Sequence, residues 1–209
     1  MIDLYTWTTP NGTKASIMLE ECGLDYKVIP VDIGSGAQRR AEFLAVNPNG
    51  KIPAIVDHEG ESGKTRVFES AAILIYLAEK SGRFLPARGA ERAETLSWLS
   101  WQAANIGPIF GQVFHFLRQA PERNDYAVER YVGESVRLLT TLDNQLAKSA
   151  YLAGDDYTIA DIATFSWLKV GLSLLQKDAA ETVPELPHTR RWLEAIGARE
   201  AVGRGVKVP

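Results

Sequence analysis

The chain has 209 residues, of which 45% are hydrophobic and 23% are charged, and both fractions are ordinary for a globular protein. This composition excludes an intrinsically disordered chain, and the single cysteine excludes a scaffold held together by internal disulfides. The formal net charge of -3 and the lack of a basic run longer than two residues argue against nucleic acid as a partner. A lone cysteine suits a reducing compartment, so we expect a cytoplasmic protein.

No segment is expected to enter a membrane. The first residues lack the basic region and the apolar run of a signal peptide. Residues 95–117 carry no charged side chain and are long enough to cross a bilayer. They include glutamine, asparagine and histidine side chains and a Gly-Pro pair, however, which a protein interior accommodates better than lipid does. We therefore expect a soluble protein in which this stretch is a buried helix, kinked at Pro108.

The hydrophobic pattern divides the chain into two parts. In residues 1–80 short β-like runs alternate with helical segments, whereas residues 91–209 are helical in pattern throughout. Residues 81–90 contain glycine and proline and are typical of a linker. The sequence therefore predicts a mixed α/β domain over residues 1–80 and an all-helical domain over residues 91–209.

The elements expected in the first part follow the order β-α-β-α-β-β-α. They are strands at residues 2–7, 26–31, 53–57 and 65–68, and helices at residues 13–22, 38–46 and 70–80. A turn over residues 8–12 precedes the first helix, and Ser70 is expected to cap the last one. A strand-helix-strand unit predicts parallel pairing, and two strands joined by a short turn predict an antiparallel pair. Thioredoxin-like domains share this order.

In the second part, helices are expected at residues 91–116, 125–148, 158–175 and 189–198. The third of these begins with a capping box, in which Thr158 and Asp161 bond each other's backbone N–H groups. We expect Asp161 to have this structural role and no part in catalysis.

Three short segments of the first part are candidates for a binding site, although each has a plain structural alternative. The turn at residues 8–12 precedes a helix, whose free N–H groups and dipole would stabilise a bound thiolate; otherwise it is an ordinary cap. Ile52-Pro53 comes just before a strand. A cis bond there would turn the backbone N–H and C=O of Ile52 outward to pair with an extended peptide, whereas a trans bond would leave an ordinary loop.

The third candidate segment is Glu69-Ser70, at the start of a helix. A carboxylate, a hydroxyl and free N–H groups together can hold the ammonium and the carboxylate of an amino acid. The alternative is that both residues serve only to start the helix.

The order and spacing of Thr9-Pro10-Asn11-Gly12, Ile52-Pro53 and Glu69-Ser70 make the chain resemble glutathione transferases. The Thr-Pro-Asn-Gly turn and the segment 47–53 are most similar to the bacterial nu class. The resemblance implies a thioredoxin-like first domain, a helical second domain and a homodimer. It also implies an enzyme that uses glutathione as co-substrate to reduce small disulfides, with conjugation of electrophiles and peroxidase activity besides.

The resemblance also implies roles for individual residues. Thr9 and Asn11 would act on the thiol of glutathione, with Tyr5 as the alternative activator. The residues implied in binding glutathione are Gln38, Lys51, Ile52, Pro53, Glu69, Ser70 and Arg130. Arg130 corresponds to an arginine that reaches a glutathione carboxylate across the dimer interface. No metal site is expected, because the three histidines show no ligand spacing with Cys22.

The energy needed to ionise a bound thiol is modest. A free thiol with a pKa of ~8.5 is only about 3% ionised at pH 7, and lowering that pKa by two units takes ~2.7 kcal/mol. A helix start and one hydrogen bond to the charged sulfur together supply about this much. Thioredoxin-like redox pairs place cysteines where this chain has Thr9 and Gly12, so the reactive thiol must come from the ligand.

Two other functions stay open at this point. One is a conventional glutathione transferase that conjugates apolar electrophiles. The other is a non-catalytic, glutathione-binding regulatory protein.

Overall fold

The computed structural model describes residues 1–209 and divides into two compact units. The first unit comprises Met1–Ala87 together with Gly197–Pro209, and the second comprises Arg88–Ile196. The division falls inside the expected linker. Residues 197–209 differ from the expectation, because they belong to the first unit and not to the helical one.

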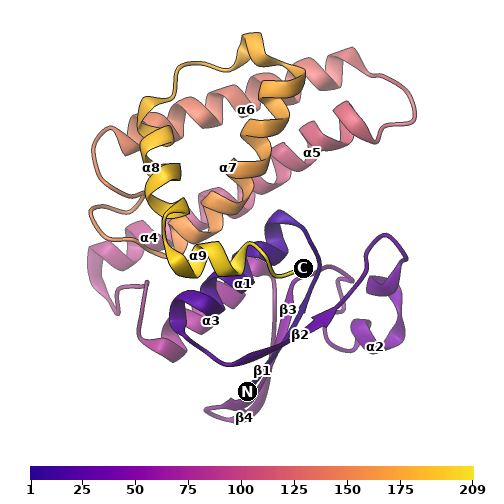
Figure 1. The fold of residues 1–209 in the computed structure, drawn as a ribbon, viewed down its shortest axis with the longest axis vertical. Helices are drawn as coiled ribbons and strands as arrows, with labels where there is room; N and C mark the ends of the chain where they lie inside the picture. Colours follow the sequence, from indigo (N-terminus) through magenta and orange to yellow (C-terminus); the bar gives the residue numbers. More distant parts are fainter. The chain divides into compact units, whose positions relative to one another are not determined.

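The first unit is built on a four-stranded mixed sheet in the order β2-β1-β3-β4 (Figure 1). The strands are β1 (Ile2–Thr6), β2 (Tyr26–Pro30), β3 (Ala54–Gly60) and β4 (Gly63–Phe68). β1 and β2 are parallel because helix α1 (Pro10–Cys22) connects them, and β3 is antiparallel to both β1 and β4. The predicted mixed sheet is therefore confirmed. The β3–β4 hairpin is longer than expected, and β3 begins only after Pro53, which has no N–H to donate.

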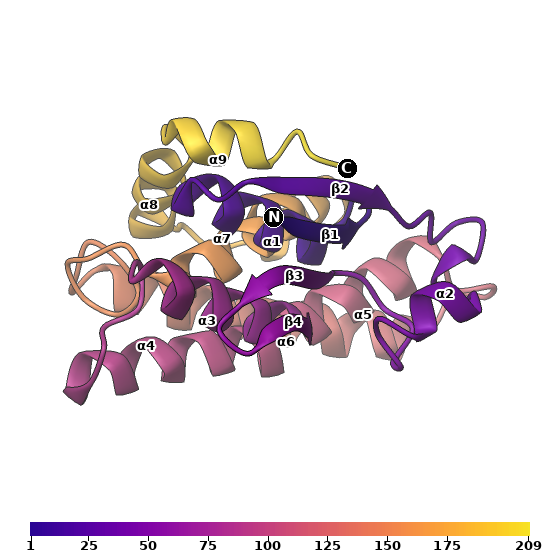
Figure 2. The same cartoon turned by 90° about the horizontal axis from the view of Figure 1, so that it is seen from below.

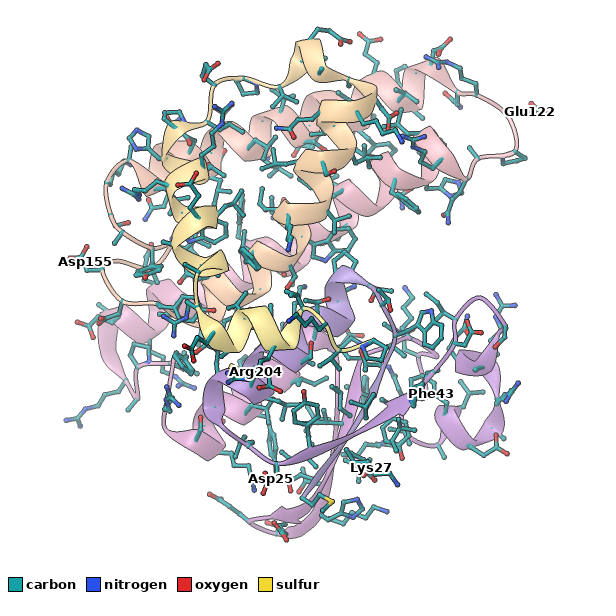
Figure 3. The ribbon with its side chains drawn as sticks, in the orientation of Figure 1. Asp25, Lys27, Phe43, Glu122, Asp155 and Arg204 are labelled. Atoms are coloured by element: carbon teal, nitrogen blue, oxygen red, sulfur yellow. The ribbon has the colours of Figure 1, made fainter.

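Helices lie on both faces of this sheet. α1 and α3 (Ser70–Ser81) cover one face, behind the strands in the view of Figure 2. On the other face, Phe43 of the short helix α2 (Ala41–Leu44) packs with Val31 and Ala54; Figure 3 labels Phe43 between α2 and the strands. The expected helix over residues 38–46 is broken at Arg40, whose extended backbone separates α2 from a 3-10 turn at Ala37–Arg39.

The last helix, α9 (Glu200–Gly205), lies along α1 and was not expected from the sequence. It is only six residues long and contains two glycines, so its own helix propensity is low. Ion pairs with α1 hold it in place. Arg204, labelled in Figure 3, donates a hydrogen bond of 2.6 Å to Glu20, and Arg199 binds both carboxylate oxygens of the buried Glu21.

The second unit is all helical, as predicted. Its helices are α4 (Gly89–Trp101), α5 (Gly107–Arg118), α6 (Asp125–Leu146), α7 (Ile159–Asp178) and α8 (Pro187–Gly197), with a π-helical turn at Gln102–Ile106 and a 3-10 turn at Ala180–Thr182. The expected distortion near Pro108 lies one turn earlier, in the π-helical turn. Pro108 follows directly in α5, and its missing N–H falls next to the π-helical turn, where the regular helical hydrogen bonds are already interrupted. None of the helices is both long enough and apolar enough to cross a membrane.

The start of α7 carries the predicted capping box. Asp161 is fully buried, and its carboxylate accepts hydrogen bonds from the backbone N–H groups of Thr158 and Leu152, each at 3.0 Å. The indole N–H of Trp192 donates a further bond of 2.9 Å to it. All the groups that Asp161 binds belong to the fold of the second unit, in agreement with its expected structural role.

Candidate active site

The three candidate segments meet at one end of the sheet in the first unit. Ala54, the first residue of β3, pairs with Tyr5 near the end of β1 and with Phe68 at the end of β4. The segments that follow β1, precede β3 and follow β4 must therefore lie near one another. The segment after β1 carries Thr9 and Asn11, and the segment before β3 carries Lys51, Ile52 and Pro53. The segment after β4 carries Glu69 and Ser70.

Thr9 is the N-cap of α1. The helix begins at Pro10, not at Thr13 as expected, because proline at the first helical position has a suitable φ and loses no helical hydrogen bond. The Thr9 Oγ1 atom accepts a hydrogen bond of 3.1 Å from the Gly12 N–H. Since a hydroxyl can accept and donate at once, its hydrogen is left to donate outward. Asn11 is the second residue of this helix and is partly buried.

Gly12 allows the start of α1 to approach the end of β1 closely. A Cβ atom at this position would overlap both the Thr6 hydroxyl oxygen and the Trp7 carbonyl oxygen. The absence of a side chain at Gly12 is therefore what lets the Thr9 cap form where it does.

The loop before β3 is braced by Asn47, which is only 1% exposed. Its side-chain amide donates a hydrogen bond of 2.6 Å to the Lys51 carbonyl oxygen, and its side-chain oxygen accepts one of 2.9 Å from the Asn49 N–H. Lys51 is exposed, Ile52 packs on the cluster around Phe43, and Pro53 is buried. The Ile52-Pro53 peptide bond is cis, which is the first of the two alternatives that the sequence left open.

Gln38 lies in the 3-10 turn before α2, next to this loop. Its carbonyl oxygen is 3.3 Å from the point where a Cβ atom of Gly50 would stand. The side-chain amide of Gln38 donates to the Ile33 carbonyl oxygen at 3.3 Å, while its Oε1 atom is buried without a hydrogen-bond partner.

Glu69 stands between β4 and α3 in an unusual backbone conformation. Its φ of 70° is in the region that side chains other than glycine rarely adopt, and Asn49 donates a hydrogen bond of 3.3 Å to its carboxylate. The expectation for Ser70 was wrong in one respect. Ser70 is the first residue of α3 and does not cap it; the cap position belongs to Glu69, which makes no side-chain cap bond. The first N–H groups of α3 therefore face the site without a side-chain cap.

Lys14 is a part of this region that the sequence analysis missed. It is only 2% exposed, and its ammonium donates a hydrogen bond of 3.3 Å to the Ser70 hydroxyl oxygen. Burial lowers the pKa of Lys14 to about 7, although the negative charge of Glu69 opposes the shift. The signal was the helical spacing: Lys14 stands three and four residues before Ile17 and Met18, on the buried face of α1.

Tyr5, the alternative activator, faces away from α1. Successive residues of β1 point to opposite faces of the sheet, and Ile2, Leu4 and Thr6 are the buried set. The ring of Tyr5 packs on that of Phe43, with the centroids 6.1 Å apart. Burial, and to a lesser extent the charge of Asp3, raise the pKa of Tyr5 above its ordinary value.

Two further residues belong to other elements of the chain. Arg130 is an exposed residue of α6 in the second unit. Cys22 is at the opposite end of α1 from Thr9, and burial raises the pKa of its thiol in spite of a contact of 3.2 Å with the Ser81 hydroxyl. The structure contains no group of three or more His, Cys, Asp or Glu residues arranged to hold a metal ion.

Comparison with known proteins identifies the family. Family models match residues 8–80 as "Glutathione S-transferase, N-terminal domain" and residues 107–200 as "Glutathione S-transferase, C-terminal domain". The chain is 47% identical over 208 residues to "Disulfide-bond oxidoreductase YfcG" of Escherichia coli (strain K12), covering 99% of this chain and 94% of that protein. It is 44% identical to "Disulfide-bond oxidoreductase YghU" of the same organism, covering 98% of this chain and 73% of that protein.

Solved structures agree with these matches. A glutathione transferase family member from Pseudomonas fluorescens Pf-5, with two glutathione molecules bound, superposes with a TM-score of 0.93 at 44% identity, covering 100% of this chain and 93% of that one. A glutathione transferase from Pseudomonas putida, with one glutathione disulfide bound per subunit, superposes with a TM-score of 0.92 at 40% identity. The match covers 100% of this chain and 91% of that one. This chain belongs to the glutathione S-transferase family.

Proposed function

We propose that the protein is a glutathione-dependent disulfide reductase of the nu class, with conjugation of electrophiles and peroxidase activity as lesser reactions of the same site. The observation that carries the proposal is the Thr9 hydroxyl, which caps α1 with its oxygen and has its hydrogen left to donate. It stands where thioredoxin-like redox pairs have a cysteine, so the reacting sulfur is that of glutathione. The names of YfcG and YghU, both disulfide-bond oxidoreductases, support the choice of reaction.

Two steps of thiol-disulfide exchange account for the reaction. The thiolate of one bound glutathione attacks a sulfur of the substrate disulfide, so that a mixed disulfide forms and the first substrate thiolate leaves. A second glutathione thiolate attacks the glutathione sulfur of the mixed disulfide, which releases the second substrate thiolate and glutathione disulfide. Two glutathione molecules are oxidised, one disulfide is reduced to two thiols, and each departing thiolate takes up a proton.

Thr9 and Asn11 are assigned to the reacting sulfur in this proposal. A hydrogen bond from Thr9 and the positive end of α1 both favour a thiolate over a thiol. Tyr5 is the weaker candidate, because its ring is packed against Phe43 on the face of the sheet away from α1.

The remaining assignments concern the peptide part of glutathione and the state of the protein. The extended backbone of glutathione pairs with the backbone of Ile52, and its γ-glutamyl group lies against the start of α3. The residues assigned to binding are Gln38, Lys51, Ile52, Pro53, Glu69, Ser70 and Arg130. We further propose a cytoplasmic homodimer in which Arg130 of one protomer serves the glutathione of the other. Related solved structures that hold two glutathione molecules, or one glutathione disulfide, per subunit support a site of this capacity.

The test is a coupled assay with bis(2-hydroxyethyl) disulfide and glutathione, in which glutathione reductase consumes NADPH as glutathione disulfide appears. We expect enzyme-dependent NADPH consumption that is unchanged in a Cys22→Ala variant, because no protein cysteine takes part. Glutathione binding with conjugation of 1-chloro-2,4-dinitrobenzene but no disulfide turnover would identify a conventional transferase. Binding with no turnover of disulfide, peroxide or electrophile would identify a regulatory protein.

A further inference from the structure

A buried lysine lies directly behind the predicted contact for the γ-glutamyl group. The Lys14 side chain runs from α1 to the start of α3, where its ammonium donates to the Ser70 hydroxyl oxygen at 3.3 Å. The residue is 2% exposed, and a lysine is almost never buried to this extent unless its charge is paired. Nothing in the proposed exchange of thiol and disulfide uses this charge.

The bond from Lys14 decides how Ser70 can act. An ammonium group has donors only, so the Ser70 oxygen must be the acceptor in this contact. The single hydrogen of the serine hydroxyl then points away from Lys14. It is available to a ligand carboxylate, together with the first N–H groups of α3. Lys14 therefore converts a hydroxyl that could either donate or accept into an oriented donor.

We propose that Lys14 is a positioning residue for the γ-glutamyl carboxylate of glutathione: its buried ammonium orients the Ser70 hydroxyl toward that carboxylate and adds a positive charge behind it. The inference rests on the proposed function, since it assumes that glutathione binds at Glu69 and Ser70. It goes beyond that function because it gives a buried residue, which acts through Ser70, a part in recognition of the carboxylate.

The acids of α1 and β1 are bound to other side chains of the first unit. Glu69, at the start of α3, is the acid whose field acts on Lys14. The acids on its own helix are paired with α9, and the acid on β1 is paired with a histidine: Glu20 with Arg204, Glu21 with Arg199, and Asp3 with His58. Burial lowers the pKa of Lys14 to about 7, so near neutrality the ammonium is only partly populated in the free protein.

Binding of a carboxylate beside Lys14 must raise this pKa again, because an opposite charge favours the charged form. Above pH 7 the ligand therefore has to recruit a proton as it binds, and its affinity falls as the pH rises. By linkage the fall is at most about tenfold per pH unit for one proton. Below pH 6 Lys14 is already charged, and the affinity becomes independent of this group.

Titration calorimetry with S-methylglutathione tests the proposal. This ligand keeps both carboxylates and the amino group of glutathione but has no ionisable thiol. For the wild type we expect a dissociation constant that is constant between pH 5.5 and 6.5 and increases several-fold between pH 7 and 8.5. Measurements in buffers of different ionisation enthalpy should show uptake of about half a proton at pH 7, where Lys14 is about half charged and the amino group of the ligand, with a pKa of ~8, is still mostly protonated.

Three variants separate positioning from general support of the fold. Lys14→Met, of similar length and uncharged, is expected to bind about tenfold more weakly at pH 6 and to lose most of the proton uptake at pH 7. Ser70→Ala should also weaken binding, and the double variant should lose clearly less than the sum of the two single losses, because Lys14 acts in part through Ser70. Glu79→Gln, at an exposed position later in α3, is the control and should titrate like the wild type.

The outcomes distinguish the two proposals. If the wild type fails to bind S-methylglutathione at any pH, the proposed function fails. If it binds with an affinity that does not change between pH 6 and 8.5 and takes up no proton, only the role of Lys14 is overturned. Additive losses in the double variant would overturn it as well. The wild-type proton uptake keeps the test decisive even if Lys14→Met does not fold.

Discussion

The Gly205 carbonyl oxygen in α9 accepts a hydrogen bond of 2.8 Å from the Ser16 hydroxyl in α1, joining residues that are far apart in the sequence. Both residues are buried, and α9 approaches α1 closely enough that a Cβ atom at Gly205 would stand 2.6 Å from the Ile17 Cα. The end of the chain is therefore fitted to the helix whose beginning carries Thr9. Support for the site comes from residues that are remote from it in sequence.

Gly205→Ala should lower the free energy of unfolding by about 1–3 kcal/mol, because backbone atoms of α1 cannot yield to the added methyl group. Gly203→Ala is the matched control in the same helix, where an added Cβ atom meets nothing within 4 Å, and it should be neutral or slightly stabilising. Thermal unfolding followed by circular dichroism compares the two. Equal melting temperatures would show that the close packing of α9 on α1 contributes nothing to stability.

Thr9→Ala should raise the pKa of bound glutathione by about one to two units, because it removes a hydrogen bond to the thiolate worth about 1.5–3 kcal/mol. It also removes the cap of α1, at a cost of about 1 kcal/mol in stability. Thr9→Ser retains the hydroxyl and should restore both properties. The ultraviolet absorbance of the thiolate, recorded against pH, measures the shift, and identical titration curves for wild type and Thr9→Ala would rule out this role.

Tyr5→Phe discriminates between the two activators. The ring of Tyr5 contributes packing against Phe43, which phenylalanine preserves, and the lost hydroxyl has a raised pKa. We expect kcat/KM for disulfide reduction to change less than threefold, against a loss of about tenfold or more in Thr9→Ala. A loss in Tyr5→Phe as large as that in Thr9→Ala would transfer the role of activator to Tyr5.

The backbone conformation of Glu69 should cost folding stability, while its carboxylate should contribute to ligand affinity. Its φ of 70° costs about 1 kcal/mol or more in any residue except glycine. Glu69→Gly should therefore be more stable than Glu69→Ala, while both lose affinity for S-methylglutathione to the same extent because both lose the carboxylate. Chemical denaturation and calorimetry give the two quantities. A Gly variant no more stable than the Ala variant would mean that the backbone at this position carries no strain.

Lys14 should give folding stability a dependence on pH of known sign. Its pKa is about 7 in the folded protein and near 10.5 when unfolded, so between these values the unfolded chain binds a proton that the folded one does not. Stability therefore rises with pH in this window, by up to about 1.4 kcal/mol per unit. Below pH 7 the contribution is constant. The difference in unfolding free energy between wild type and Lys14→Met, measured from pH 6 to pH 9, should grow in favour of the wild type above pH 7.

The sequence predicted those parts of the fold that depend on local pattern. The β-branched and aromatic residues of Tyr26–Pro30 and the capping box at Thr158 and Asp161 are local signals, and the structure contains both features. The helix α9 depends on tertiary contacts, since the sequence Glu-Ala-Val-Gly-Arg-Gly has little helix propensity of its own. For the same reason the extent of the last domain was misjudged.

The candidate site shows the same division. The Thr-Pro-Asn-Gly turn and Glu69-Ser70 stand out in the sequence, and the pairing of Ala54 with Tyr5 and Phe68 brings them together. Lys14 did not stand out, because a lysine in a helix is normally exposed. Tertiary packing, including that of α1 on α3, makes it an internal charge. The cap of α3 was misplaced because a positive φ at Glu69 is set by its surroundings and has no signature in the residue type.

The position of the single cysteine affects how readily oxidants can inactivate the protein. Cys22 lies at the end of α1 remote from Thr9, partly buried and with a raised pKa. Peroxides and alkylating agents attack thiolates, so they find no protein nucleophile to inactivate at the start of that helix. The sulfur at risk is the glutathione molecule itself, which diffuses away and is replaced. An oxidised or alkylated glutathione is replaced by another glutathione molecule, so damage to the reacting sulfur does not require synthesis of a new polypeptide.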